Sequence, residues 1–259
     1  MASQRKPVVV VTGASKGIGL AVTRILLESL DAVVVAISRT KTAELEDLSK
    51  AHISTLSTVE CSVADAKGLT EAMASAEKTH KHIDGIILNA GVLDPLGRID
   101  SADVDAWKSH FDVNFFSLLT ALKATLPALR RSELGGKVVF VSSGAAVGGT
   151  AAWGAYNASK AAMNSLCRTL AQEEPDVVSV ALRPGMVDTG MQEALRSEGR
   201  AHMKEQDHTR FTEAYSSGKL VKPEDSGHVI AALALKADKS LSGQFVSWDS
   251  DLCAAYRKK

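Results

Sequence analysis

Short apolar runs rich in valine and isoleucine recur along the chain, and the gaps between most of them are long enough for a helix. The runs are continuous rather than alternating, which is typical of strands covered on both faces. Strands that alternate with helices predict a parallel sheet wound right-handedly, with helices on both faces. We therefore expect a doubly wound α/β fold of about seven strands, at residues 8–12, 32–38, 55–59, 85–88, 137–141, 177–182 and 244–248.

Segments with helical periodicity separate these runs. We expect helices at residues 18–29, 66–81, 101–129, 153–172 and 224–235. Residues 189–222 differ, because this stretch is long and charged and contains no strand-like run. Long connections near the carboxyl end of a strand commonly bind or cover ligands, so a substrate lid is expected there. The alternative is a surface excursion without a role.

Composition limits the domain organisation and the partners. The 259 residues, 45% of them hydrophobic, can bury one sizeable core, so we expect a single domain over residues 1–259. Thirty basic and thirty acidic side chains cancel, and the pI is near 7.1. This balance provides no overall field for nucleic acid or an anionic membrane, and no apolar stretch approaches the ~18 residues that span a bilayer. The expected partners are small molecules.

Cysteine and histidine usage bears on compartment and metals. Cys61, Cys167 and Cys253 are far apart, which favours free thiols in a reducing compartment and predicts a cytoplasmic protein. The seven histidines, including His80 and His82, are expected to be solvated. No ligand spacing predicts a metal site.

A glycine-rich turn follows the first expected strand and opens the first expected helix. Its spacing, Gly-x-x-x-Gly-x-Gly, lets the backbone turn tightly and approach a pyrophosphate, whose charge then meets free helical N–H groups. The turn predicts a dinucleotide site formed by Gly13, Ser15, Lys16, Gly17, Ile18 and Gly19.

The end of the second expected strand indicates which nicotinamide dinucleotide binds. NAD sites place a carboxylate there for the ribose hydroxyls, whereas NADP sites offer a cation to the 2′-phosphate. Here the strand ends in Ser38 and Arg39, without a carboxylate, and Lys16 in the glycine turn adds a second cation. The sequence therefore predicts NADP(H) as the cofactor.

Tyr156 and Lys160 are four residues apart on an expected helix, so they share one face about one turn apart. An ammonium about 4 Å from a phenol, in an effective dielectric of about 20, favours the phenolate by roughly 4 kcal/mol. This interaction would lower the pKa of Tyr156 by about three units. Such a tyrosine could exchange protons near neutral pH.

Several short motifs occur together in one order along the chain. They are residues 12–19, Asn89-Ala90-Gly91, Asp112-Val113-Asn114, Ser142-Ser143, residues 156–160, Pro184-Gly185, Val187 and Thr189. In this order they resemble the classical short-chain dehydrogenase/reductase family over nearly the whole chain. Through residues 111–117, 141–145 and 184–192, the chain most resembles fungal sepiapterin-reductase-like and benzil-reductase-like proteins. The resemblance implies a Rossmann-like fold and an NADPH-dependent carbonyl reductase.

The resemblance also implies roles for individual residues. Tyr156 would be the general acid that gives a proton to the substrate carbonyl oxygen, and Lys160 would tune its pKa and hold the nicotinamide ribose. Ser143 would hydrogen-bond the same oxygen, and Asn114 would hold a water that feeds protons towards Lys160. Further cofactor contacts are implied at Ser62, Val63, Asn89, Ala90, Gly91, Pro184, Gly185, Val187 and Thr189.

Two positions depart from the family pattern. Ser62 stands where the family usually has an aspartate for the adenine amino group. Ser247 stands where sepiapterin reductases carry an aspartate that anchors the pterin. Asp249 lies two residues further, on the same face of a continued strand, and is a possible substitute.

The substrate site and the assembly are expected from apolar side chains. A pocket closed by the lid is expected from Leu93, Trp153, Met186, Met191, Phe211 and Tyr215. A homodimer or homotetramer is expected through the helix from Ser101 and the Tyr156 helix, whose face carries Ala158, Ala161 and Ala162.

Three functional hypotheses remain. The first is reduction of a small ketone or diketone, benzil-like or an aryl ketone. The second is reduction of sepiapterin or another pterin. The third, of a different class, is a non-catalytic NADP-binding regulatory protein, against which the complete Asn, Ser, Tyr and Lys set argues.

Overall fold

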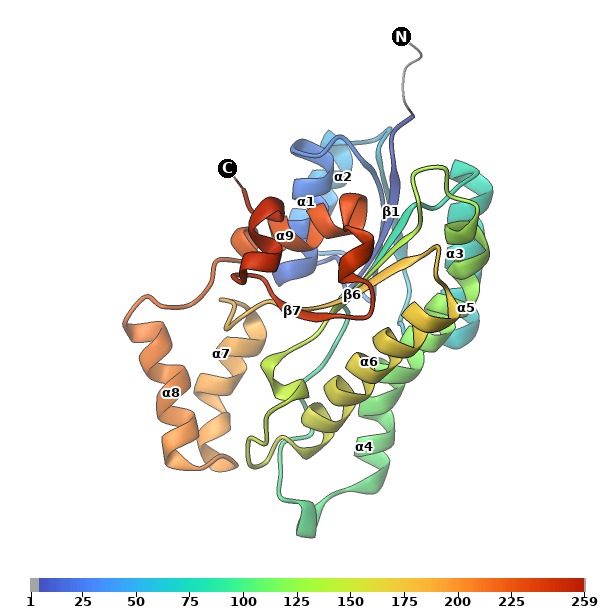
Figure 1. Ribbon diagram of the computed structural model, residues 1–259. Helices are drawn as coiled ribbons and strands as arrows, with labels where there is room; N and C mark the ends of the chain where they lie inside the picture. The colour runs from blue at the N-terminus through green and yellow to red at the C-terminus, as the bar shows by residue number, and fades with distance from the viewer. Residues whose placement is uncertain (1–4, 259) are drawn as a thin grey trace.

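The structure is a computed structural model that describes residues 5–258. Its centre is a sheet of parallel strands in the order β3-β2-β1-β4-β5-β6-β7 (Figure 1). The strands are β1 (Val8–Thr12), β2 (Val33–Ser38), β3 (Leu56–Glu60), β4 (Gly85–Leu88), β5 (Lys137–Val141), β6 (Val178–Arg183) and β7 (Phe245–Ser247). The predicted doubly wound sheet is confirmed, with strand ends within about one residue of those expected.

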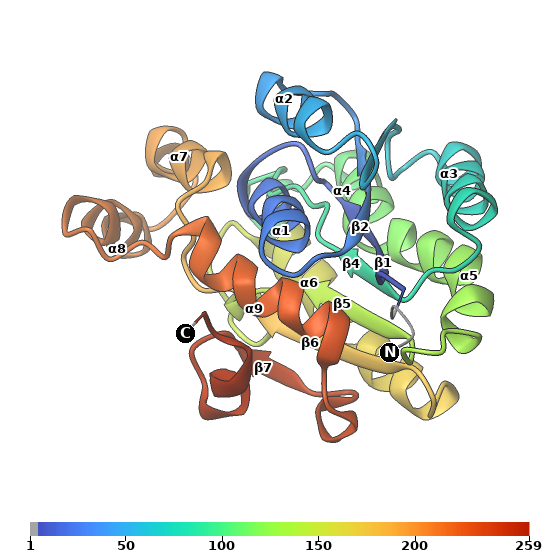
Figure 2. The same ribbon diagram turned by 90° about the horizontal axis from the view of Figure 1, so that it is seen from above.

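Helices cover both faces of the sheet, because the strands carry apolar side chains on both faces and each face must be shielded from water. In β1, Val9 and Val11 join one core, whereas Val8 and Val10 join the other. Figure 2 shows α1 and α9 on one side of the sheet and α3 and α5 on the other. The first core is covered by α1 (Gly17–Glu28), α2 (Ala43–Ala51) and α9 (Pro223–Lys236). The second is covered by α3 (Ala66–His80), α5 (Ser117–Arg130) and α6 (Gly154–Glu173).

The strand order reverses between β1 and β4, since the chain moves outward from β1 to β3 and then returns to the other side of β1. In open parallel sheets, ligands bind outside the carboxyl ends of the strands at such a switch point. The glycine turn after β1 and the Asn89 segment after β4 both lie at this edge.

The expected helix at residues 101–129 is divided in the structure. A 3₁₀ turn, η1 (Ile99–Ser101), is followed by α4 (Val104–Phe111), which Asp103 caps by accepting from the backbone N–H groups of Asp105 and Ala106. A π-helical turn, η2 (Asp112–Phe116), then leads into α5. Such π-helical turns occur often at functional sites, and this one carries Asn114.

The helix α2 (Ala43–Ala51) was not expected from the sequence. The Thr42 side chain caps α2 by accepting from the backbone N–H of Leu45, and Glu44 and Glu46 lie in the first turn, with Lys50 in the last. These are ordinary helix-end signals, so the sequence contained the information needed.

Residues 189–222 contain two helices that were not expected, α7 (Gly190–Ser197) and α8 (Glu205–Ser216). They pack against each other and project beside the sheet (Figure 1, Figure 2). The two ends of the segment meet, because Asp188 donates its backbone N–H to the Val221 carbonyl, and Val221 donates to that of Met186. The segment is therefore an excursion that leaves and rejoins the body at one place.

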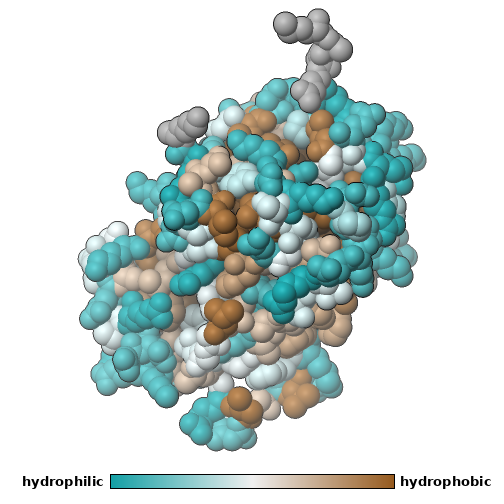
Figure 3. Space-filling view, viewed as in Figure 1, coloured by the Kyte–Doolittle hydropathy of each residue, from teal (hydrophilic) through white to brown (hydrophobic). Residues whose placement is uncertain are grey.

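Within residues 5–258, no helix is long and apolar enough to cross a bilayer. The face drawn in Figure 3 is mostly hydrophilic, with apolar areas scattered over it. The remaining 3₁₀ turns are η3 (Gly144–Ala146), η4 (Gly199–Ala201), η5 (Lys239–Leu241) and η6 (Asp251–Tyr256).

Candidate active site

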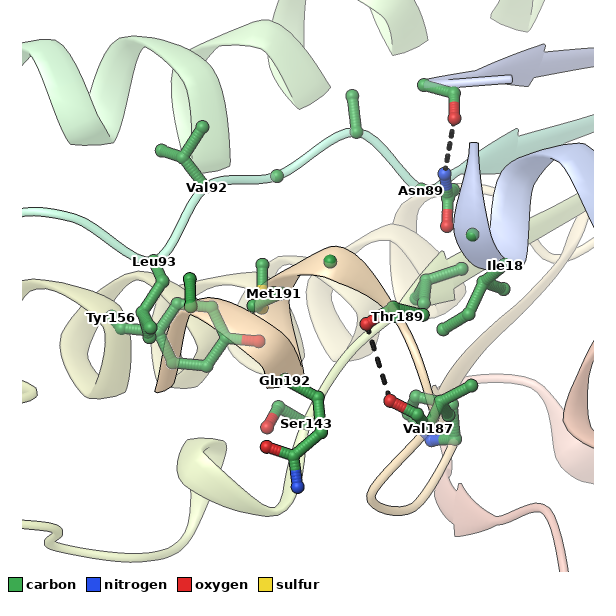
Figure 4. A pocket seen from close by; sticks show the side chains of 18 of the residues that line it. Ile18, Asn89, Val92, Leu93, Ser143, Tyr156, Val187, Thr189, Met191 and Gln192 are labelled. Carbon is green, nitrogen blue, oxygen red and sulfur yellow. Dashed lines mark hydrogen bonds between the residues drawn. The ribbon is translucent and has the colours of Figure 1, made fainter. Parts of the chain in front are cut away.

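A cavity of about 750 Å³ opens at the carboxyl ends of the strands, between the sheet and the segment that carries α7 and α8. Figure 4 shows part of its wall. All the predicted cofactor residues line it except Gly19, which lies behind the turn. The lining residues among them are Gly13, Ser15, Lys16, Gly17, Ile18, Ser38, Arg39, Ser62, Val63, Asn89, Ala90, Gly91, Tyr156, Lys160, Pro184, Gly185, Val187 and Thr189.

The turn after β1 is too tight for side chains. Gly13 has a φ of +67°, and a Cβ there would lie 2.9 Å from the Ala90 Cα. A Cβ at Gly19 would lie 2.1 Å from the Gly13 carbonyl oxygen. Asn89 holds the turn from β4, since its Nδ2 donates to the carbonyls of Thr12 at 2.9 Å and Gly13 at 3.1 Å.

The amino end of α1 faces this cavity and suits an anion. The N-cap residue is Lys16, whose side chain makes no cap hydrogen bond with any described residue, and the first turn carries no acidic residue. The first N–H groups of the helix and the positive end of its dipole therefore remain for a ligand. Together with the glycine turn, this end fits the pyrophosphate of a dinucleotide.

The edge of the cavity next to β2 has no carboxylate on the strand end. Ser38 is buried, and its hydroxyl donates to the Thr40 carbonyl at 3.0 Å, whereas Arg39 is exposed at the cavity wall. Ser62 and Val63 line the same cavity from the end of β3. An exposed guanidinium at this place suits the 2′-phosphate of NADP.

Tyr156 and Lys160 lie on α6, as their spacing predicts, and Ser143 follows β5. The Tyr156 phenol and the Ser143 hydroxyl both face the cavity (Figure 4). The Lys160 Nζ lies 5.7 Å from the centre of the Tyr156 ring and donates to the Val141 carbonyl at 2.8 Å. The three side chains thus form one cluster at the end of β5.

The expected lowering of the pKa of Tyr156 is wrong for this structure. Burial raises the pKa of Tyr156 above its usual 10, and the nearby Ser143 hydroxyl offsets only part of that increase. The same burial lowers the pKa of Lys160 to about 8. The spacing of the two residues indicates the effect of the ammonium on the pKa of Tyr156, but not the opposing loss of water around the phenol. At neutral pH, Tyr156 is a protonated donor beside a mostly charged Lys160.

Asn114 does not line the cavity but is fully buried behind it. Its Nδ2 donates to the Val92 carbonyl at 2.9 Å, and its Oδ1 accepts from the Val92 N–H at 2.8 Å. The predicted water between Asn114 and Lys160 stays a prediction. What the structure places there is an amide that holds the chain after β4.

His110 contradicts the expectation that all the histidines are solvated, because it is 2% exposed. Its Nδ1–H donates to the Asp94 carbonyl at 2.6 Å, and its Nε2 accepts from Asn114 Nδ2 at 2.9 Å. Burial lowers the pKa of His110, so the ring is neutral near pH 7. The four-residue spacing from Asn114 was the available sequence signal.

Five of the six predicted substrate-pocket residues line the cavity, namely Leu93, Trp153, Met186, Met191 and Phe211. Trp153 meets the Tyr156 ring edge-on, with centroids 5.7 Å apart, and stacks on Phe211. The prediction for Tyr215 is wrong. Its side chain is 54% exposed and lies under the Arg196 guanidinium, because its position on α8 faces solvent.

Neither Ser247 nor Asp249 reaches the cavity. The Ser247 hydroxyl instead donates to an Asp249 carboxylate oxygen at 2.5 Å. The substitute anchor suggested by their spacing is therefore absent from the described cavity wall.

Gln192 lines the cavity from α7 and was not expected from the sequence. It is 4% exposed, yet neither Oε1 nor Nε2 has a hydrogen-bond partner within residues 5–258. The Trp153 indole N–H is also buried without a partner in the described part of the chain. Gln192 is the last residue of the motif at residues 184–192, but that motif assigned it no role, and only the fold turns this face of α7 inward.

The chain matches a protein-family model described as short chain dehydrogenase over residues 7–200. It is 42% identical over 251 residues to an uncharacterized oxidoreductase of Schizosaccharomyces pombe, covering 96% of this chain and 99% of the relative. It is 35% identical over 254 residues to a benzil reductase ((S)-benzoin forming) of Saccharomyces cerevisiae, covering 94% and 96%.

A solved structure is also closely similar. The crystal structure of a short chain dehydrogenase/reductase from Saccharomyces cerevisiae superposes with a TM-score of 0.92 at 34% identity. The match covers 97% of this chain and all of that one.

Proposed function

Because the chain belongs to the short-chain dehydrogenase family, an oxidoreductase family that uses nicotinamide cofactors, we propose that it is an NADPH-dependent carbonyl reductase. Its substrates are small ketones or diketones, benzil-like or aryl ketones. The observation that carries this proposal is that the hydroxyls of Tyr156 and Ser143 face the cavity beside apolar side chains such as Leu93 and Met191, with Lys160 behind them.

The cluster supports proton transfer to a carbonyl oxygen. Ser143 donates a hydrogen bond to that oxygen and stabilises the charge that develops on it. Tyr156 donates its phenolic proton to the same oxygen, and together with a hydride delivered to the carbonyl carbon this gives the alcohol product. The charged Lys160 stabilises the phenolate that forms, and Asn114 holds the chain after β4 against this cluster.

The cofactor assignment is supported by the glycine turn, the amino end of α1 and the exposed Arg39. A bound NADPH would supply the hydride for the carbonyl carbon. Lys16 and Arg39 would bind its phosphates, and Ser62 and Val63 would lie along the adenine.

The pocket walls favour a flat aromatic ketone. Trp153 and Phe211 are stacked rings, and Leu93, Met186 and Met191 add apolar surface. A pterin carries several hydrogen-bonding groups, and each one buried without a partner costs about 1–3 kcal/mol. With Ser247 and Asp249 outside the cavity, pterin reduction is the weaker alternative.

The segment 189–222 is proposed to be the substrate lid of a single domain. Met191, Leu195 and Phe211 reach the cavity from this segment, and its ends are joined by the backbone bonds of Val221. A non-catalytic regulatory role is the less favoured alternative, since a regulator needs no proton donor beside a ketone-sized pocket. We also propose a cytoplasmic location, as the free cysteines favour.

The test is steady-state reduction of benzil, an aryl monoketone and sepiapterin with NADPH and with NADH. We expect turnover with NADPH, and a higher kcat/KM for benzil than for sepiapterin. Tyr156→Phe should keep the melting temperature and cofactor binding but lose about 10²–10⁴-fold in rate, since only the acidic hydroxyl is removed. No turnover of any carbonyl compound by the wild type, or near-normal turnover by the variant, would contradict the proposal.

A further inference from the structure

Gln192 carries an unusual buried amide. Its side chain is 4% exposed, and both polar atoms are without a partner among the described side chains and backbone. An unpaired buried polar group costs about 1–3 kcal/mol, and a methionine of similar length would fill the same space at no such cost. An amide at this place therefore indicates a partner that comes from outside the chain.

The location of the amide limits what that partner is. Gln192 belongs to the cavity that Ser143 and Tyr156 also line, and Figure 4 shows the three side chains in the wall of that cavity. Apolar side chains also line this cavity and pack together in one cluster. They include Leu93, Ala145, Trp153 and Leu195, with Met191 and Phe211 packed against them.

We propose that Gln192 determines substrate specificity by donating its Nε2–H to the second carbonyl oxygen of a vicinal dicarbonyl whose first carbonyl lies between Ser143 and Tyr156. The inference rests on the proposed reductase activity and narrows it to one substrate class. In a vicinal dicarbonyl the two oxygens sit on adjacent carbons, so a second donor beside the Ser143–Tyr156 pair is what such a molecule requires. A monoketone leaves this amide unpaired.

The polarity of the amide also fits a ketone oxygen better than an anion. Gln192 is neutral, and it presents an acceptor oxygen beside its donor. The charged residues that the segment 189–222 contributes to the cavity wall, Glu198 and Arg210, are exposed rather than buried with the amide. A neutral second carbonyl matches one uncharged donor in an apolar wall.

The experiment compares benzil with deoxybenzoin, which has the same two rings but a methylene in place of one carbonyl. Both are assayed with the wild type, Gln192→Met and Gln192→Glu, at saturating NADPH. Gln192→Met keeps the length of the side chain and removes both polar atoms, whereas Gln192→Glu keeps an acceptor and removes the donor. Melting temperatures are measured for each protein.

We expect both variants to lose about tenfold in kcat/KM for benzil and to stay within about twofold for deoxybenzoin. Gln192→Met should melt at the same or a higher temperature, because an unpaired polar group has been removed. A residue that only supports α7 would lower the melting temperature and reduce both activities together. Glu193→Met, at the exposed neighbouring position of the same helix, is the matched control. It should leave kcat/KM unchanged for both substrates.

Each other outcome has a defined meaning. Equal losses on both substrates, or no loss on either, overturn the assignment of Gln192. If Trp153→Phe loses the preference for benzil and Gln192→Met keeps it, the indole N–H makes the second contact. That result also overturns the assignment of Gln192. A wild type that reduces deoxybenzoin but not benzil also overturns the inference while leaving the reductase proposal standing. A wild type that reduces no ketone contradicts the proposed function itself.

Discussion

At the scale of single residues, burial determines the protonation of the candidate catalytic pair. Tyr156 and Lys160 share one face of α6, as the spacing requires, but both are enclosed by the protein. Loss of water disfavours the charged form of each group, so the pKa of Tyr156 is raised and that of Lys160 is lowered. The sequence alone showed their proximity, and the tertiary structure determined their burial.

The first residue-scale prediction concerns pH. Lys160, with a pKa of about 8, is charged below that value and neutral above it, while Tyr156 stays protonated. We expect kcat/KM for reduction to be constant from about pH 6 to about pH 8 and to decrease above about pH 8. Kinetics over this range provide the measurement. The residual activity of Lys160→Met should show no decrease above about pH 8. The same decrease in that variant would show that another group titrates there.

The lowered pKa of Lys160 affects stability in the opposite direction to activity as the pH rises. Between about 8 and its ordinary value of 10.5, the unfolded Lys160 holds a proton that the folded one has lost. Unfolding therefore takes up a proton in this window, and the contribution of Lys160 to stability increases as the pH rises through it.

The second residue-scale prediction concerns cofactor preference. Arg39→Asp removes a cation from the end of β2 and adds a charge that repels a 2′-phosphate. A charge-assisted hydrogen bond contributes about 1.5–3 kcal/mol, so the ratio of NADPH to NADH affinity should fall by about 10–100-fold. Dissociation constants from fluorescence titration are the readout. Lys41→Asp makes the same charge change on an exposed side chain outside the cavity wall and should keep the preference. Equal affinities for the two cofactors in the wild type would refute the assignment.

At the scale of elements, Asp84 joins three parts of the sheet where β4 begins. It accepts from both terminal nitrogens of Arg5, from the Val8 N–H at 2.9 Å and from the Ser132 hydroxyl at 2.5 Å. Burial acts to raise the pKa of Asp84, but these donors together hold it below its usual 3.8. The stability that Asp84 contributes is therefore complete above that value and lost as the pH falls through the lower folded value.

The element-scale prediction follows from these contacts. Asp84→Asn keeps the size of the side chain but replaces charge-assisted acceptors, and it should lower the free energy of unfolding by about 2–3 kcal/mol. Urea denaturation monitored by circular dichroism provides the measurement. Asp100→Asn disrupts the fully exposed pair with Arg98 and should leave the urea midpoint unchanged. A comparable loss in both variants would show that Asp84 has no special role in joining the strands.

At the scale of the whole molecule, α4, η2, α5 and α6 present apolar and small side chains to solvent. Val104, Phe116 and Leu119 are exposed at 64%, 51% and 41%, and Ala158 and Ala161 are exposed on α6. These side chains support the proposal that a second copy of the chain packs on this face, to form a homodimer or homotetramer.

The whole-molecule prediction is a multimeric mass by light scattering at micromolar concentration. Phe116→Asp combined with Leu119→Asp should reduce that mass to one chain, because two buried charges would oppose the contact. Ile53→Asp changes an apolar residue that is 84% exposed elsewhere and should leave the mass unaltered. A wild type of single-chain mass would end the proposal.

The sequence by itself determined the parallel sheet, the glycine turn and the pairing of Tyr156 with Lys160, because these depend on local periodicity and short spacing. Ser143 was expected beside this pair from the family resemblance. Long-range packing decided the rest. Only the fold turned Gln192 inward and Tyr215 outward, buried His110 against Asn114 and kept Asp249 away from the cavity. Whether a side chain faces water or another element depends on segments distant in sequence, and desolvation by those segments also decides its pKa.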